Sequence, residues 1–444
     1  MQRRFVIGVF IGLLVCVTAP RAVGEEAVIE DVLAILKERG ILDEGEYSRL
    51  VTKHQNYAAR HERLMPNIEW FGDLRVRYES FWFDRDSGNV DRSNRHRGRY
   101  RFRIGGRTEI NDYIGVEFRL ATGSESDSRN LSFGDAVDFA PDGIFIDYAF
   151  LDVTPFPNLA DRIPKGDLSL RVGKMPNPFL WKVGKDILLW DADITPEGAA
   201  LQFSAEPNAA LRLFLNAGYF IIDENNMSRD PHFAALQLGG EHHFSPVLDL
   251  GAHASWYGFG SLDPAFVTRH ASEGNIPDGL TGGLQGSSGA NIGELSVYLR
   301  MRCQRLPDWP LLVYGQLANN FSAEESALFP EADTEGRAWL LGLEVGDKRR
   351  IAALGLGYGY LEANAFPAQF VDSDFLDSRT NRRGWILYGS RMILPNTDLN
   401  LTLLYGSDEI ENFRGDHALG GPLFDASVAD AERIRFEADL VVNF

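Results

Sequence analysis

The chain has 444 residues, 44% of them hydrophobic, and a formal net charge of -19. This acidic balance argues against nucleic acid as a partner, because surfaces that bind nucleic acid are basic. Beyond the N-terminus, no apolar run reaches the ~20 residues that a membrane-spanning helix needs, which excludes a helical membrane protein.

The first 24 residues have the pattern of a signal peptide. Arg3 and Arg4 precede an apolar run over residues 5–17, and small residues follow at 22–24. A single membrane anchor is the alternative, but the run is short and acidic residues follow it at once. Cleavage would remove three arginines and lower the net charge from -19 to -22. Cys303 would then be the only cysteine, so we expect no internal disulfide.

Residues 25–66 predict a short helical prefix. Apolar residues recur at helical spacing between Val28 and Leu36, and Gly40 supplies a stop. Asp43 and Glu46 then form a capping box at the start of a second helix. Two such helices bury little surface alone, so we expect an appendage, and the sequence leaves open whether it enters the rest of the fold or hangs outside it.

From residue 67 to Phe444 the chain alternates between apolar and polar residues in segments of about 8 to 13 residues, the length of a tilted strand that crosses a bilayer. The first such segment is 69–83, the second is 99–110 and the third is 114–120. Further alternating segments surround Ile146, Leu170, Leu201, Leu213, Leu236, Leu250, Val297, Val313, Leu341, Leu356, Leu387 and Leu401. With a last segment at 432–444, this pattern predicts about sixteen strands, or eighteen if a long loop contains a further hairpin.

The links between these segments alternate in length, which favours a membrane barrel over a soluble sandwich or propeller. Short links rich in turn-forming residues lie at 111–112, 206–208, 245–246, 347–349 and 395–397, with somewhat longer ones at 156–164 and 303–310. Long, polar and acidic links lie at 123–143, 258–290, 321–336, 362–383 and 407–431.

The last segment is the natural seam of such a barrel. Ile434, Phe436 and Leu440 alternate with polar residues up to a final Phe444. Strands in lipid must pair on both edges, because an unpaired backbone group there is costly. We therefore predict an all-β transmembrane fold, an antiparallel up-and-down β-barrel, with Phe444 as its assembly signal.

The inward faces of the last strand and the first three strands predict one continuous basic wall. We expect the following residues to line the interior: Arg75, Arg77, Arg99, Arg101, Arg103, Arg107, Arg119, Arg433 and Arg435. Acidic neighbours partly neutralise this wall. It is either a set of solvated ion pairs without selectivity or a patch that concentrates and steers anions.

The link at residues 175–198 is too apolar for a solvated loop. Phe179, Trp181 and Trp190 need a dry environment, so we expect this loop to fold into the barrel and narrow it. Four acidic residues on the loop would then face the basic wall across the constriction, namely Asp186, Asp191, Asp193 and Glu197. Opposed charges on two sides of a constriction favour polar solutes over apolar ones.

Several of these stretches resemble a family of outer-membrane porins from Gram-negative bacteria. They are GKMPNPF at 173–179, WDADITPEGAA at 190–200, NRHRGRYRFR at 94–103 and the helical prefix at 31–50. The resemblance implies a diffusion channel, but it supplies no substrate. The homotrimer that we expect comes from porins in general and not from a motif here.

We therefore expect a channel for passive diffusion of small hydrophilic solutes in the cell outer membrane, with the prefix in the periplasm. The alternatives are a specific channel for anions or a polysaccharide, and a plugged structural barrel tethered to the cell wall. The expected partners are membrane lipid and the barrel-assembly machinery. The sequence has no phosphate-binding glycine loop or serine-nucleophile motif, so we expect no enzyme activity, no catalytic residues, no cofactor and no metal.

Overall fold

The computed structural model describes residues 33, 35–37, 39, 42–52, 68–84, 94–123, 128–135, 137–181, 183–185, 187–226, 229–262, 274–276, 280, 289–326, 333–375, 379–408 and 432–444. The chain divides into two compact units at Asn67 and Ile68. Within the described residues, no helix is long and apolar enough to cross a membrane.

The N-terminal unit contains a helix at residues 44–52. Its first turn is closed by the predicted capping box. The Glu46 backbone N–H donates to Asp43 Oδ1 at 2.8 Å, and the Asp43 backbone N–H donates to Glu46 Oε2 at 3.2 Å. Lys37 pairs with Glu44 at 2.7 Å across the link that precedes this helix.

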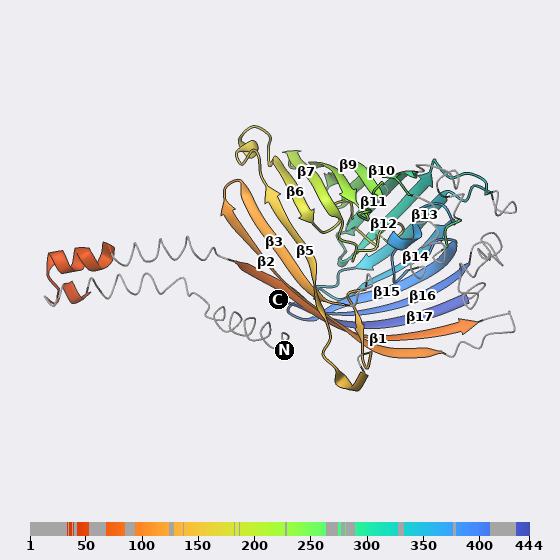
Figure 1. The fold of residues 1–444 in the computed structure, drawn as a ribbon, viewed down its shortest axis with the longest axis horizontal. Coiled ribbons are helices and arrows are strands. Elements are labelled where there is room, and N and C mark those ends of the chain that lie inside the picture. The colour runs from red at the N-terminus through yellow and green to blue at the C-terminus, as the bar shows by residue number, and fades with distance from the viewer. Residues whose placement is uncertain are drawn as a thin grey trace. The chain divides into compact units, whose positions relative to one another are not determined.

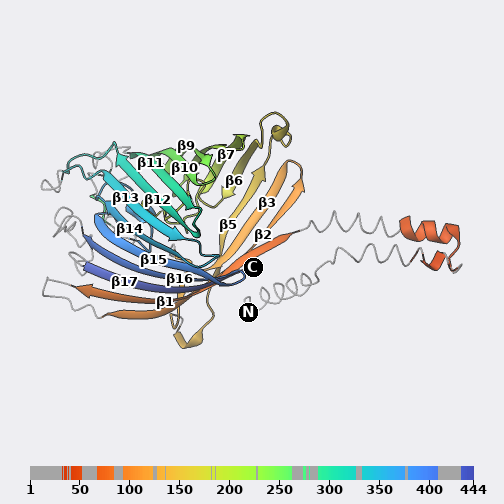
Figure 2. The ribbon, with the colours of Figure 1, turned by 180° about the vertical axis from the view of Figure 1, so that it is seen from behind.

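The second unit is a ring of antiparallel strands (Figure 1, Figure 2). In the described part of the chain there are seventeen strands; β4 has two residues, and the other sixteen form the ring. Their bounds are β1 Glu69–Asp84, β2 Arg95–Asn111, β3 Ile114–Thr122, β4 Leu131–Ser132, β5 Ile144–Val153, β6 Asp167–Lys174, β7 Glu197–Asn208, β8 Leu211–Ile221, β9 His232–Ser245, β10 Leu248–Gly260, β11 Asn291–Cys303, β12 Leu306–Asn320, β13 Arg337–Gly346, β14 Ala353–Leu361, β15 Arg382–Leu394, β16 Thr397–Asp408 and β17 Glu432–Asn443. The predicted fold and strand count are thus confirmed.

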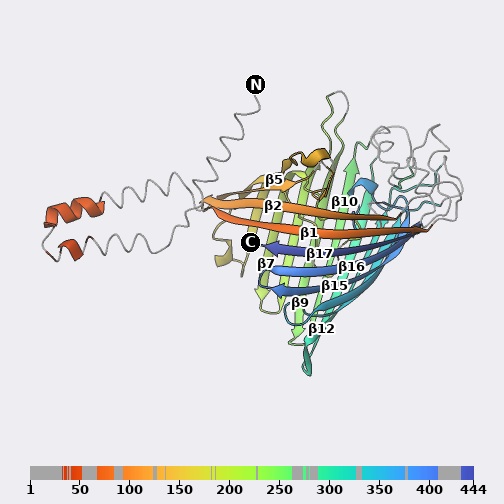
Figure 3. The same ribbon diagram turned by 90° about the horizontal axis from the view of Figure 1, so that it is seen from below.

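The ring closes where β1 pairs with both β2 and β17, which lie on either side of it in Figure 3. The β1–β17 register runs from Asp73 opposite Asn443 to Asp84 opposite Glu432. Two further hydrogen bonds extend this seam, from the Gly72 N–H to the Phe444 carbonyl at 2.8 Å and from the Phe444 N–H to the Gly72 carbonyl at 3.0 Å. The Phe444 ring stacks against Phe102 on β2.

Side chains alternate between the two faces of each strand, as the period-two pattern predicts. On β1, Leu74, Val76 and Tyr78 are exposed on the outer face, whereas Arg77 and Glu79 are buried inside the ring. Exposed leucine, tryptophan and tyrosine side chains continue this apolar outer face on the other strands. An apolar exterior, with the charged side chains of β1 inside the ring, suits a protein surrounded by lipid.

Links at one end of the ring are short and those at the other are long, with one departure from the predicted bounds. We expected the link at 303–310 to be somewhat longer than a tight turn, but the turn is at residues 304–305 and β12 begins at Leu306. Pro307 and Pro310 lie where the β11–β12 register shifts, between Met301 and Cys303. Proline is tolerated at such irregularities because no ladder hydrogen bond is required of it there. Among the described residues, short 3-10 helices lie in other links, at Val137–Phe139, Leu159–Asp161 and Ala368–Phe370.

Candidate functional site

The arginines of β1, β2, β3 and β17 form one inner surface, here called the arginine wall. Cross-strand register places Arg77 opposite Arg99 on one side and opposite Asp439 on the other. Arg77 is 3% exposed and pairs with Asp439 at 2.6 Å and Glu437 at 2.8 Å. A cationic surface is thus interleaved with carboxylates from the same strands.

The remaining wall residues have similar partners. Asp73 accepts from Arg103 at 2.6 Å and from Arg101 at 3.1 Å, and Arg99 lies 3.8 Å from Glu79. Because nearly every one of these guanidinium groups has a carboxylate partner, the wall carries far less free positive charge than its arginine count suggests.

Five predicted wall residues are in different surroundings. Arg435 is 4% exposed and pairs with Glu79, Glu437 and a loop carboxylate described below. Arg433 packs over the Phe81 ring at 5.0 Å. Arg119 pairs with Asp147 on β5 at 2.6 Å. Arg107 is exposed near the turn end of β2, where it pairs with Glu69 at 2.8 Å, and Arg75 hydrogen-bonds Asn130.

The loop between β6 and β7, residues 175–196, is buried inside the ring and is called the third loop. Met175, Phe179, Leu188, Leu189 and Trp190 are each at most 3% exposed. These apolar side chains pack against the inward aromatic residues of β8, β9 and β10. The apolar content of this loop is therefore satisfied by the barrel's own inner surface.

Trp190 is the centre of this packing. Its ring centroid lies 5.4 Å from those of Phe233 and Tyr257 on the strands. It also lies 5.0 Å from the ring of Phe366 and 5.7 Å from that of Phe370, which belong to a different loop. One tryptophan thus joins the third loop to both the wall of the ring and a second loop.

Amide side chains of the strands hold the third-loop backbone in place. Gln237 donates from Nε2 to the Phe179 carbonyl at 2.8 Å, and Asn216 donates from Nδ2 to the Pro178 carbonyl at 3.1 Å. A backbone carbonyl that is buried in this way needs such donors. The start of the loop is therefore fixed to β8 and β9.

The second inward loop, residues 362–381 between β14 and β15, is called the seventh loop. Its Phe366 is fully buried and its Val371 and Phe375 are nearly so. Asn275, in the link between β10 and β11, holds this loop by donating to the carbonyls of Ala363 at 2.7 Å and Phe366 at 2.8 Å. We predicted a long, polar link here. The loop instead folds inward, because it contains these apolar residues.

The two inward loops bind each other through backbone and carboxylate groups. The Asp191 backbone N–H donates to the Phe370 carbonyl at 2.8 Å, and the Ser373 backbone N–H donates to Asp191 Oδ2 at 2.8 Å. Burial, reinforced by the nearby Asp193, raises the pKa of Asp191. Burial and the nearby Asp191 and Asp374 raise the pKa of Asp372 well above its usual value.

Asp374 links the seventh loop to the arginine wall. Its carboxylate lies 2.9 Å from Arg77 and 2.8 Å from Arg435. Burial opposes ionisation of Asp374, but Arg77 and Arg435 outweigh it and hold the pKa well below its usual value. The sequence interpretation missed this residue as a partner of the wall.

The four predicted acidic residues of the third loop have different positions. Asp193 contacts the wall directly, at 3.5 Å from Arg101 and 3.8 Å from Arg103. Asp191 joins the two loops instead, and Asp186 lies outside the described residues. The prediction for Glu197 is wrong, because Glu197 is the first residue of β7 and its carboxylate pairs with Lys174 at 2.7 Å, away from the wall.

Together the two loops connect opposite sides of the ring. The third loop packs on β8–β10, and its Asp193 reaches β2; the seventh loop starts from β14, and its Asp374 reaches β1 and β17. At these points the acidic and basic groups are in contact, with no gap between them. A transverse field across an open gap is therefore not the arrangement at Asp193 or Asp374.

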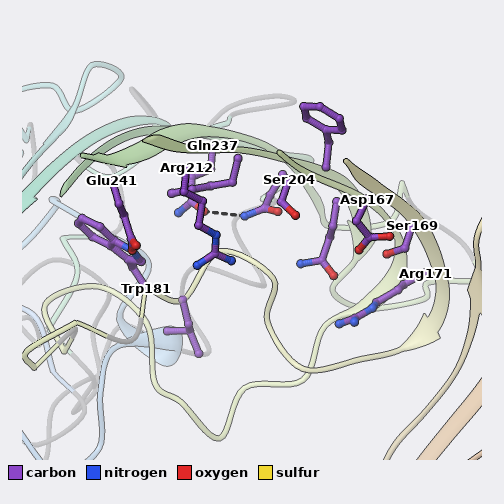
Figure 4. Close-up of a pocket in the computed structure, with 13 residues that line it drawn as sticks. Asp167, Ser169, Arg171, Trp181, Ser204, Arg212, Gln237 and Glu241 are labelled. Carbon is purple, nitrogen blue, oxygen red and sulfur yellow. Dashed lines mark hydrogen bonds between the residues drawn. The ribbon is translucent and has the colours of Figure 1, made fainter. Parts of the chain in front are cut away.

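Among the cavities lined by described residues, two polar ones lie beside the third loop, near the turn ends of the strands. One, of about 310 Å³, is lined by residues of β6–β9 together with Leu180 and Trp181 (Figure 4). The other, of about 610 Å³, is lined by Lys185 of the third loop and by residues of β11–β16, including Arg300, Arg302 and Tyr388. Within the described ranges, no group of three or more His, Cys, Asp or Glu residues could hold a metal ion.

Glycines on the inner face of β13 and β14 make room for this interior packing. They are a sequence signal of close packing inside the ring that the sequence analysis did not use. A side chain at Gly342 would lie 2.2 Å from the Tyr314 ring, and one at Gly355 would lie 2.0 Å from the Tyr388 ring. A larger residue at either position would force the tyrosine ring to move.

The chain is similar to known proteins in family and in fold. A family model described as "Putative porin" matches residues 88–273 and 291–427, which is more than half of the chain. No curated protein matches the sequence.

Among solved structures, OprB of Pseudomonas putida at high pH is similar in fold, with a TM-score of 0.52 and 10% identity over 87% of this chain and 96% of that one. The outer membrane channel DcaP of Acinetobacter baumannii gives a TM-score of 0.46 and 10% identity, with 86% of this chain and 98% of that one covered.

Proposed function

This chain belongs to the putative porin family, and from that premise we propose that it allows passive diffusion of small hydrophilic solutes across the outer membrane, through a passage narrowed by the third loop. Family membership makes it a porin-like outer-membrane channel. The observation that carries the finer proposal is the third loop itself, whose apolar residues are buried inside a closed ring with an apolar exterior. Porins are channels and not enzymes, and we propose the same of this chain.

The role of the arginine wall follows from its ion pairs. Since Arg77, Arg101 and Arg435 have carboxylate partners, we propose that the wall gives the passage a polar, nearly balanced surface and at most a modest anion preference. This favours a general diffusion channel over an anion-specific one. Of the wall residues, Arg75 has a neutral partner, Asn130, and is the best remaining site for an anion.

Planar-bilayer recording of the refolded full chain tests this function. We expect stable single-channel conductance, together with a permeability ratio of anion to cation close to balanced. A strong anion preference that disappears in Arg75→Gln would instead support the anion-specific channel. The absence of conductance from correctly folded barrels, judged by heat-modifiable migration on a gel, would exclude every channel function.

A plugged structural barrel is the second candidate, and one observation favours it: both inward loops contact the arginine wall directly through Asp193 and Asp374. A swelling assay with liposomes that contain the protein separates the two readings. Uptake of small sugars would exclude a plug, whereas folded barrels that admit none would support it.

We propose the following surroundings for the protein. Lipid contacts the exposed apolar outer face, the barrel-assembly machinery inserts the chain, and residues 25–66 lie in the periplasm after removal of residues 1–24. We also propose a homotrimer. Cross-linking of whole cells followed by mild electrophoresis would reveal the trimer, and protease access from the periplasmic side would locate the prefix.

A further inference from the structure

The cavity of about 310 Å³ beside Trp181 has the properties of a binding site (Figure 4). It lies inside the ring near the turn ends of β6–β9, below the start of the third loop. Its volume is at the lower end of the range of small-molecule pockets, about 300 to 1,000 Å³. The cavity therefore suits a small solute. Its role in binding a solute that passes through the barrel rests on the channel function proposed above.

Charged groups with no partner distinguish this cavity from the arginine wall. Arg212 on β8 and Glu241 on β9 are directly opposite in the strand register. Opposite charges at such positions normally pair, because their Cβ atoms are about 5 Å apart. Within the described part of the chain, neither side chain makes an ion pair or a side-chain hydrogen bond, and Figure 4 shows both extending into the cavity.

The far end of the cavity is also charged. Asp167, at the start of β6, lines it without an ion pair to any described residue, beside Ser169 and Arg171. Arg171 is held by Asp152 at 3.0 Å. The unpaired groups are thus one guanidinium and two carboxylates.

The framework around these charges is fixed. Gln237 uses its amide to hold Phe179, and Asn216 uses its amide to hold Pro178 and to donate to Gln237 at 2.8 Å. Trp181 is held by ring contacts with His253 and Tyr298, whose centroids lie 4.5 and 5.1 Å from its own. A fixed framework lowers the cost of binding, because little has to be ordered when a ligand enters.

We propose that this cavity binds small zwitterions of the amino-acid and short-peptide class on their way through the channel. The solute carboxylate would pair with Arg212, in the bidentate geometry that guanidinium groups favour. The solute ammonium group would pair with Glu241 or Asp167. A simple anion would leave both carboxylates uncompensated, and an uncharged sugar would leave all three charges unpaired.

Current blockage measured on single channels of the full chain tests the proposal, with the zwitterionic dipeptide alanylalanine, the polyol mannitol and inorganic phosphate as probes. We expect alanylalanine to interrupt the current at lower concentration than the other two. Arg212→Gln and Glu241→Gln should each raise its half-blocking concentration about tenfold, the loss expected for one charge-assisted hydrogen bond. Arg350→Gln changes an exposed turn residue paired with Asp308, and its half-blocking concentration should equal that of the wild type.

Three results would overturn the assignment: equal blockage by mannitol, blockage by phosphate alone, or no effect of Arg212→Gln on blockage by alanylalanine. Heat-modifiable migration would verify that each variant forms the barrel. Calorimetric titration of the detergent-solubilised protein with alanylalanine measures binding without relying on conductance. A barrel that binds the dipeptide but does not conduct would contradict the channel function alone, and one that conducts but gives no binding heat would contradict only the zwitterion site.

Discussion

Among the described residues of the third loop, Asp193 is the one that forms ion pairs with the arginine wall. It lies 3.5 Å from Arg101 and 3.8 Å from Arg103, which also share Asp73. In Asp193→Asn the wall gains about one positive charge, so the reversal potential in a salt gradient should shift towards anion preference. The stability loss should be small, under about 1 kcal/mol, because the pair is loose and remains partly solvated.

Glu197→Gln is the matched control for Asp193→Asn. It removes the same charge from a residue near the same loop, but Glu197 pairs with Lys174 and not with the wall. Its reversal potential should equal that of the wild type. If the two variants shift selectivity equally, the contact between Asp193 and the wall has no role in ion preference.

The carboxyl groups between the inward loops should make loop docking sensitive to pH. Burial and the nearby Asp191 and Asp374 raise the pKa of Asp372, so the docked loops favour the protonated carboxyl group. The stability gained from protonated Asp372 is therefore present at low pH and is lost as pH rises through that raised pKa. The pKa of Asp374 is lowered, so its ion pairs with Arg77 and Arg435 persist down to the usual aspartate range, about pH 4. Between pH 7 and about pH 4, acidification should therefore tighten the contact between the loops.

Hydrogen exchange at the Asp191 and Ser373 amides measures this effect, since both donate across the loop contact. Protection factors should rise as pH falls in the wild type. Asp372→Asn removes the titrating group, keeps an oxygen for the Asp374 and Phe375 amides, and should give high protection already at pH 7. An identical pH dependence in both proteins would show that Asp372 is not the responsible group.

Which residues face inward could be predicted from the sequence, but how they pair could not. Period-two alternation is a property of each strand alone, so the positions of Arg77, Arg99 and Arg435 followed from it. Asp374, the loop partner of Arg77 and Arg435, lies 297 residues from Arg77 and 61 from Arg435 along the chain. Only the closed ring brings these groups together, and no local pattern encodes that contact.

At the scale of elements, the third loop depends on one side chain. Trp190 is 3% exposed and contacts Phe233, Tyr257 and Phe366. Trp190→Ala would lose this packing at a cost of about 3–5 kcal/mol, so the loop should detach while the strands remain intact. Single-channel recordings should then show higher conductance and more open-channel noise.

Trp190→Phe is the corresponding control, because it keeps a six-membered aromatic ring and removes the smaller five-membered ring with its N–H, for which no described residue serves as a hydrogen-bond partner. Its conductance should stay near that of the wild type. Unchanged conductance and noise in Trp190→Ala would mean that the third loop does not limit the passage.

The strands were predicted more completely than the loops, for a physical reason. A strand of a lipid-facing barrel must alternate between apolar and polar residues along its whole length, which leaves a regular pattern. A loop that folds inward needs only a few apolar residues. Those at 179–190 are dense enough to be noticed, whereas Phe366, Val371 and Phe375 of the seventh loop are dispersed among acidic residues. Their common burial becomes visible only in the structure.

At the scale of the whole molecule, the ring depends on the seam between β1 and β17. Apart from this pair, neighbouring strands of the ring follow one another along the chain, with only the two-residue β4 between β3 and β5. In contrast, β1 and β17 are separated by nearly the entire chain. Their pairing therefore has the largest loop-closure cost of any pair in the barrel. Contacts that extend this seam should matter most for assembly.

Phe444 makes such contacts in two ways, and two variants separate them. Deleting Phe444 removes both backbone hydrogen bonds to Gly72, each contributing about 0.5–1.5 kcal/mol, together with the ring that stacks on Phe102. Phe444→Ala removes the ring and keeps the backbone bonds. We expect the yield of heat-modifiable barrels in the outer membrane to fall in both variants, and further in the deletion, because the seam then loses its last hydrogen-bonded pair. If the deleted chain inserted at the wild-type yield, closure would have to depend on the ladder from Asp73 to Asp84 alone.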